Sequence, residues 1–99
     1  MTNEVRYEIQ AEAWRIPGPG GWYFLTLPKQ ESVEIKAVFA MLRKPYGSIP
    51  VVATIGKTSW KTSIFPDKKS DTYSLPLKAE VREKEAIEAG DTVRFQIEI

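Results

Sequence analysis

Two basic residues in the last quarter of the chain, Lys78 and Arg82, have a spacing suited to anion binding. Residues four positions apart on a helix are neighbours on its surface, so the ammonium and the guanidinium could bind one anion together. An indole and two hydroxyl groups elsewhere in the chain are of the kind that orient a ligand in a small-molecule pocket. We therefore predict a ligand-binding site that comprises Lys78, Arg82, Trp60, Thr62 and Ser63.

The segment around Arg82 also has a purely structural interpretation, in which Arg82 forms an ion pair with a carboxylate such as Asp91. Residues 78–91 carry three basic and five acidic side chains, a balance that does not suit a DNA-reading surface. Glu80 and Lys84 have the spacing of a helix-stabilising pair. Gly90 and Asp91 are typical of a turn in which the carboxylate accepts bonds from nearby backbone amides.

A second group of basic residues raises the alternative of nucleic-acid binding. Lysines interleaved with aromatic residues could bind a single strand through phosphate contacts and base stacking. Strand alternation, however, places Trp60 and the neighbouring lysines on opposite faces, which favours an ordinary solvated surface. The residues of this alternative are Lys57, Lys61, Lys68 and Lys69.

Much catalytic chemistry is excluded because the chain has no cysteine and no histidine. Disulfides, thiol catalysis and the commonest general base and metal ligand are therefore absent. The sequence "GKTS" at 56–59 lacks the first glycine of a phosphate-binding loop and precedes a predicted strand instead of a helix. We expect no metal and no cofactor, and an enzyme is only the third functional alternative.

Size and composition indicate one soluble domain spanning residues 1–99. The 99 residues are 42% hydrophobic and 27% charged, with a net charge of +1, which gives no general attraction to nucleic acid or anionic membranes. No apolar run approaches the ~20 residues that span a bilayer. The start "MTNEVRYEIQ" has no basic-then-apolar plan, so we expect no signal peptide and a cytoplasmic location.

Alternation of apolar and polar residues predicts six strands. The first covers 5–13, with a parity break at Trp14 that suggests a bulge or an exit from the sheet. "WYFLTL" at 22–27 is apolar on both parities, so we expect both of its faces to be covered. Residues 49–56 and 57–65 form a hairpin across Gly56-Lys57. "TYSLPL" precedes a charged segment, and "DTVRFQIEI" ends the chain with Val93, Phe95, Ile97 and Ile99 inward.

Two short helices complete the predicted elements. Ile35, Val38, Phe39 and Leu42 recur at helical spacing after Glu31 and predict a helix that ends before "KPYGS" at 44–48. The second helix follows Leu75-Pro76. Such short strands and tight turns favour a small closed or partly open β-barrel.

The order strand, Leu-Pro, helix, glycine, strand occurs twice, with Leu27-Pro28 and Gly47 in the first copy and Leu75-Pro76 and Gly90 in the second. We interpret this as an internal pseudo-repeat. The alternative is chance, since proline commonly ends a strand.

The second copy resembles the swapped-hairpin barrels of AbrB-type transition-state regulators and antitoxins, in which two chains build one barrel. The matching positions are Leu75, Pro76, Lys78, Arg82, Ile87, Gly90, Asp91 and Val93. This resemblance implies that two halves within one chain could form the barrel alone, and it supports the nucleic-acid alternative.

Nearly the whole chain, residues 6–99, resembles the DUF 1905 family, whose members are small β-barrels. The resemblance lies in "WYFLTLP", "SIPVVATIGKTSWKTSIFP", "YSLPLKAEVREKEAIEAGDTV" and the terminal strand. It implies a fold but no activity. One departure is the longer, more apolar segment 31–44, which leaves the loop near Tyr46 unspecified.

These observations together predict a non-enzymatic binding module for a small anionic ligand or a protein partner, monomeric or weakly dimeric. An AbrB-like nucleic-acid-binding protein is the alternative, and an enzyme without a recognisable site comes next.

Overall fold

The chain folds as two successive β-β-α-β units. The computed structural model describes residues 5–42 and 44–99. The first unit contains β1 (Arg6–Arg15), β2 (Tyr23–Thr26), α1 (Lys29–Val38), a 3₁₀ turn η1 (Ala40–Leu42) and β3 (Ile49–Ile55). The second contains β4 (Thr58–Asp67), β5 (Thr72–Leu77), α2 (Ala79–Glu85) and β6 (Thr92–Glu98). Residues 1–4, on which the expected absence of a signal peptide partly rests, and residue 43 lie outside the described residues.

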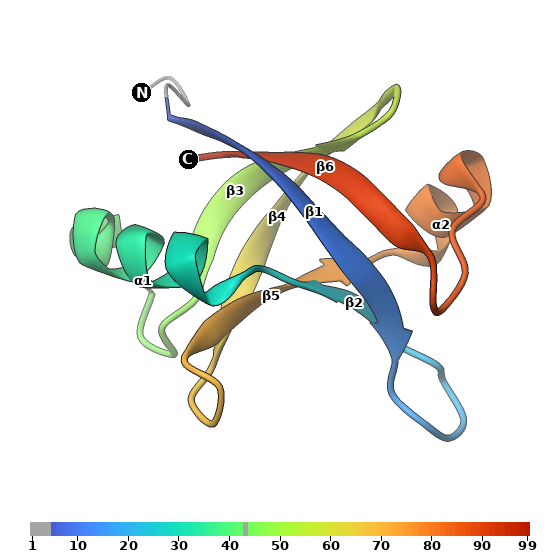
Figure 1. Ribbon diagram of the computed structural model, residues 1–99, viewed down its shortest axis with the longest axis horizontal. Coiled ribbons are helices and arrows are strands. Elements are labelled where there is room, and N and C mark those ends of the chain that lie inside the picture. Colours follow the sequence, from blue (N-terminus) through green and yellow to red (C-terminus); the bar gives the residue numbers. More distant parts are fainter. Residues whose placement is uncertain (1–4, 43) are drawn as a thin grey trace.

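The six strands found in the described residues close into one barrel (Figure 1). Their order around the barrel is β1-β2-β5-β4-β3-β6, and each pair of neighbours is antiparallel. The predicted six-stranded β-barrel with two short helices is therefore confirmed, and the barrel is closed. Closure leaves no long sheet edge open to pairing with another chain.

Alternation defines the inside of the barrel. In β3, Ile49, Val51, Ala53 and Ile55 are all buried, and Val93, Phe95, Ile97 and Ile99 are buried at the C-terminal end. β3 and β4 are joined by the predicted two-residue turn, which Gly56 permits with a φ of +57°. Asp91 accepts a hydrogen bond from the Glu88 amide at 2.8 Å, as the turn chemistry predicted.

The predicted parity break at Trp14 is wrong. Trp14 stays in register opposite Phe24 and points outward like Glu12 before it, so no bulge is needed. β1 instead changes partner: it pairs with β6 through Glu12 and with β2 from Ala13.

The expectation that both faces of 22–27 are covered is also wrong. Leu25 and Leu27 are buried, but on the outer face Trp22 is 61% exposed and Phe24 is only half-buried. The sequence places large apolar groups on both faces, and only the inner face is covered.

The first helix begins earlier and ends sooner than predicted, at Lys29 and Val38. Ile35 and Phe39 are buried as expected, whereas Val38 and Leu42 are exposed. The helix is followed by the 3₁₀ turn η1 after Phe39, so its face toward the barrel is short. That face consists of the buried residues Ser32, Ile35 and Phe39.

The two units are related by a pseudo-two-fold exchange. Exchanging β1 with β4, β2 with β5 and β3 with β6 leaves every neighbour relation in the barrel unchanged. The helices lie at opposite ends of the barrel (Figure 1). The predicted pseudo-repeat is thus present in the topology.

The register of the β2–β5 ladder shows which residues of the two units are equivalent. Leu25 pairs with Leu75, and the residues before the two helices, Pro28 and Lys78, are equivalent. Pro76 lies inside β5 and therefore does not correspond to Pro28. The two Leu-Pro sequences are out of step by two residues, so the alignment predicted from them is wrong in detail.

Candidate functional site

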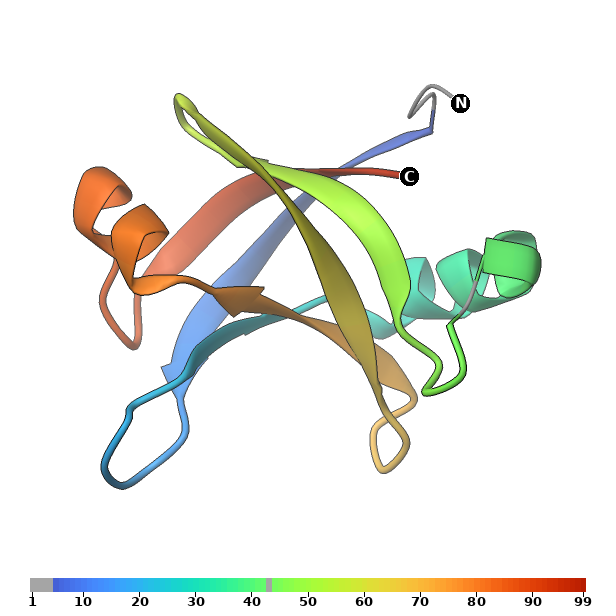
Figure 2. The same ribbon diagram turned by 180° about the vertical axis from the view of Figure 1, so that it is seen from behind.

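Between β4 and β5 the barrel wall is paired over only part of the strands' length. Their ladder covers only Phe65–Asp67 opposite Thr72–Ser74, and toward α2 the two strands diverge (Figure 2). Pro76 lies in the diverging part of β5, and its ring nitrogen offers no hydrogen to a ladder. This local sequence is consistent with a wall that opens on the α2 side.

An apolar pocket of about 610 Å³ lies at this opening. One cation and one hydroxyl stand among apolar side chains. The lining residues are Ile16, Trp22, Phe24, Thr62, Phe65, Pro76 and Lys78.

Aromatic side chains form much of the pocket wall and pack beside it. The Trp14 and Phe24 rings stack with centroids 5.0 Å apart, and the Trp14 indole donates a 2.7 Å hydrogen bond to Thr26 Oγ1. Trp22 and Phe65 are 61% and 47% exposed. The predicted site residues did not include the apolar lining residues Trp22, Phe24 and Phe65, although apolar residues on both parities of 22–27 were a usable signal.

Two of the predicted site residues, Lys78 and Thr62, line this pocket. Thr62 pairs with the buried Val51 and shares its face of the sheet, whereas Ser63 pairs with the exposed Pro50 and points the other way. Ser63 is not among the residues that line the pocket, although Phe65, on the same face of β4, is. Within the described part of the chain, Lys78 makes no ion pair.

Arg82 contacts an aromatic ring instead of the carboxylate of Asp91. Its guanidinium lies 3.8 Å from the centroid of the Tyr23 ring, a cation–π arrangement. Asp91 bonds the Glu88 amide, so the Arg82–Asp91 pair of the structural interpretation does not form. Arg82 Nε is buried and has no hydrogen-bond partner among the described residues.

Trp60, the remaining predicted residue, is half-buried against the core. Its indole Nε1 is buried and lacks an acceptor in the described part of the chain. Large aromatic residues in cores usually place such a polar tip on a partner.

Helix α2 contacts the barrel through a buried side chain near its start and a hydrogen bond at its last residue. Val81 is buried, and Thr58 Oγ1 at the start of β4 donates a 2.7 Å hydrogen bond to Glu85 Oε2. On its solvent side, Lys84 Nζ lies 3.0 Å from Glu80 Oε1, and this contact lowers the pKa of Glu80. The predicted Glu80–Lys84 pair is confirmed.

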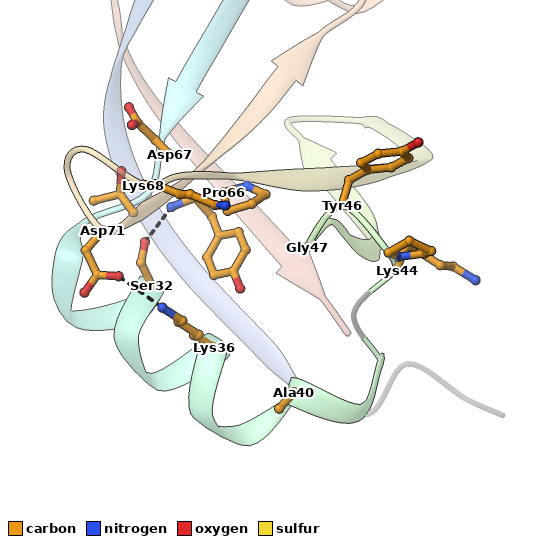
Figure 3. Close-up of a pocket in the computed structure, with 13 residues that line it drawn as sticks. Ser32, Lys36, Ala40, Lys44, Tyr46, Gly47, Pro66, Asp67, Lys68 and Asp71 are labelled. Carbon is orange, nitrogen blue, oxygen red and sulfur yellow. Dashed lines mark hydrogen bonds and ion pairs between the residues drawn. The ribbon is translucent and has the colours of Figure 1, made fainter.

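A second, polar cavity of about 570 Å³ lies at the α1 end (Figure 3). Lys36 points toward Asp71, with Nζ and Oδ1 3.5 Å apart. Asp67 accepts a bond from the Lys69 amide, and Ser32 Oγ accepts one from the Tyr73 amide. These contacts occupy polar groups of Lys36, Asp71, Asp67 and Ser32, and the cavity is also lined by Lys44 and Lys68.

The four lysines of the nucleic-acid alternative do not form one patch. Lys57 lies in the β3–β4 turn, Lys61 near the middle of β4, and Lys68 and Lys69 in the turn beyond its other end. At about 3.3 Å per residue, β4 separates the two turns by roughly 30 Å.

The described residues carry neither a metal-binding cluster nor a membrane-spanning helix. They contain no group of three or more acidic side chains placed to hold a metal ion. None of their helices is long and apolar enough to cross a membrane.

Comparison with known proteins gives the chain a family. A search of curated proteins finds no match. The family described as "Domain of unknown function (DUF1905)" matches residues 10–97, which includes all six strands at least in part, both helices and every residue of the α2-side pocket. The chain belongs to the DUF1905 family.

Proposed function

We propose that this protein is a non-enzymatic binding module for a small organic anion with an apolar body. The observation that carries the proposal is the pocket beside α2, in which Lys78 is the one charged lining residue. A volume of about 610 Å³ lies within the usual range of small-molecule sites.

The pocket suits such a ligand on two grounds. Trp22, Phe24 and Phe65 would cover the apolar body, and burial of apolar surface contributes about 25 cal/mol per Å². Lys78 then supplies a positive charge at the wall, and the Thr62 hydroxyl supplies a donor or acceptor. A small molecule fits this concave surface better than a flat protein face does, which is why we prefer it to a protein partner.

A matched pair of probes tests the proposal. We expect 2-naphthoate to bind the full chain and its uncharged analogue 2-naphthamide to bind more weakly, as measured by calorimetry. Lys78→Gln should weaken naphthoate by about fivefold, since an exposed charge contributes about 1 kcal/mol, and leave naphthamide unchanged. Trp22→Ala should weaken both because it removes apolar wall.

Lys29→Gln is the control variant. Lys29 is exposed at the first residue of α1, at the other end of the barrel, so its loss should not change binding of either probe. Absence of naphthoate binding, or equal effects of Lys29→Gln and Lys78→Gln, would contradict the proposal.

A further inference from the structure

The internal symmetry of the barrel allows its two ends to be compared residue by residue. Counting from the equivalent pair Pro28 and Lys78 makes Ser32 of α1 equivalent to Arg82 of α2. Trp14 and Phe65, the ladder partners of Phe24 and Ser74, are likewise equivalent. Counting back along β1 and β4 then makes the inward-facing Ile9 equivalent to Trp60.

At the α1 end, neither of these positions leaves a polar side-chain atom without a partner. Ser32 Oγ accepts the Tyr73 amide hydrogen at 3.0 Å and donates to the Leu27 carbonyl at 3.4 Å. Ile9 is buried and has no polar side-chain atom. At these two positions the α1 end therefore leaves no polar side-chain atom without a partner.

At the α2 end, the same two positions carry N–H donors. Arg82 Nε and Trp60 Nε1 are buried, and neither meets an acceptor in the described residues. Nearly all buried polar groups in proteins have a partner, so two such donors in one region call for an acceptor. At the equivalent positions of the α1 end, Ser32 has its partners and Ile9 has no polar side-chain atom.

The two donors belong to elements that contact each other, α2 and β4. Glu85 of α2 is bonded to Thr58 of β4, while Lys78, just before α2, shares the pocket with Thr62. Helix and strand thus run side by side in opposite directions between these contacts. Trp60 lies between Thr58 and Thr62 on the same face of β4, as Arg82 lies between Lys78 and Glu85.

We infer that Arg82 Nε and Trp60 Nε1 form an inner oxyanion site that binds the carboxylate of the ligand, with Lys78 at its mouth. The inference rests on the proposed function, and it narrows the ligand class to apolar monocarboxylates. A carboxylate has two oxygens for two N–H donors, and its charge balances a guanidinium that has no carboxylate partner in the described chain. Stacking on Tyr23 holds the guanidinium in place.

Nitrogen-15 NMR of the full chain tests this inference, because the Trp indole N–H and the Arg Nε–H each give a separate signal. We expect 2-naphthoate to shift both signals downfield and to slow their exchange with water. 2-Naphthamide should shift the Trp22 indole, which reports the outer pocket, without these effects. Trp14, whose indole already has a partner in Thr26, should keep its exchange rate.

Variants separate donor loss from loss of packing. Trp60→Phe keeps an aromatic ring without the N–H and should weaken naphthoate about tenfold and naphthamide hardly at all. Trp14→Phe, which removes a partnered N–H outside the pocket, is the control. A variant that weakens both probes equally would instead indicate a packing role and would overturn the inference.

The outcomes distinguish the two proposals. Naphthoate binding at Trp22 with unchanged Trp60 and Arg82 signals leaves the proposed function standing and overturns the inner site, whose donors then bind water only. If naphthoate does not bind but acetate shifts the two signals, the inner site stands without the outer pocket. If neither acid has an effect, both proposals fall.

Discussion

At the scale of single residues, Tyr7 shows how one hydroxyl links helix and barrel at the α1 end. Burial, a hydrogen bond from its hydroxyl to Glu34, and the charges of Glu34 and Glu31 raise the pKa of Tyr7 to about 12. In the unfolded chain this pKa is about 10. The folded state therefore favours the protonated tyrosine, and its stabilisation is complete below pH 10 and is lost as pH rises toward 12.

We expect Tyr7→Phe to lower the free energy of unfolding at pH 8 by on the order of 1 kcal/mol, because it removes this hydrogen bond. Between pH 10 and 12 the difference between the variant and the natural chain should shrink. Urea unfolding followed across this range measures both effects. Tyr46→Phe, at a position 91% exposed, serves as control. A difference that stays constant with pH would contradict the assigned pKa.

Some of the residues discussed above can be selected from residue type and spacing in the sequence, whereas others cannot. Trp60, Thr62, Lys78 and Arg82 could be selected from residue type and spacing, since indoles, hydroxyls and cations are recognisable in a sequence. Ser32 could not, because a buried serine with two backbone partners looks like any polar helix residue until the Tyr73 and Leu27 contacts are known.

At the scale of elements, the side-chain hydrogen bond from Thr58 of β4 to Glu85 of α2 should hold the helix against the barrel. α2 has seven residues, too few to be stable as an isolated helix. We expect Thr58→Val, which removes the hydroxyl bonded to Glu85, to speed amide hydrogen exchange in α2. The free energy of unfolding should fall by about 1 kcal/mol.

Thr54→Val is the matched control for this prediction. Thr54 also makes a side-chain hydrogen bond, to Ser59 at 2.8 Å, but on the exposed face of the β3–β4 hairpin. Its replacement should leave exchange in α2 unchanged. Equal exchange in the two variants would show that the Thr58–Glu85 bond does not hold the helix.

The elements themselves were largely predictable, and the exceptions have physical causes. The strands follow from a period of two, and β3 and β6 bury the residues that alternation selects. The end of α1 was not predictable from period alone, since Val38 and Leu42 fit a helix face but lie beyond the contact with the barrel. The open outer face of β2 depends on where β4 and β5 part, which is a tertiary property.

At the scale of the whole molecule, pseudo-symmetry coexists with complementary side-chain volumes. Ile9 faces Phe95 across the β1–β6 ladder, and the equivalent pair across β4–β3 is Trp60 with Ala53. Small and large residues thus alternate between the two equivalent ladders. Close-packed interiors tolerate neither overfilling nor voids, so this pairing should direct the two halves to bind each other rather than themselves.

Two fragments obtained by splitting the chain at the β3–β4 turn test whether the halves bind each other in preference to themselves. Neither β3 nor β6 has a strand neighbour within its own half, so fragments 1–56 and 57–99 should each be unfolded alone. A one-to-one mixture should regain the circular dichroism of the barrel. Self-association of fragment 57–99 should fail because it would set Trp60 against Phe95 twice.

Replacing Trp60 by isoleucine in fragment 57–99 should then allow a symmetric dimer, because the contact becomes the isoleucine–phenylalanine pair already present at Ile9 and Phe95. Sedimentation equilibrium distinguishes a dimer from a monomer, and circular dichroism shows whether it is folded. Trp22→Ile, at an exposed tryptophan before β2, is a control in fragment 1–56 and should not promote dimers. A folded dimer of the unsubstituted fragment 57–99 would show that volume complementarity does not select the pairing, since the overfilled ladder would then be tolerated.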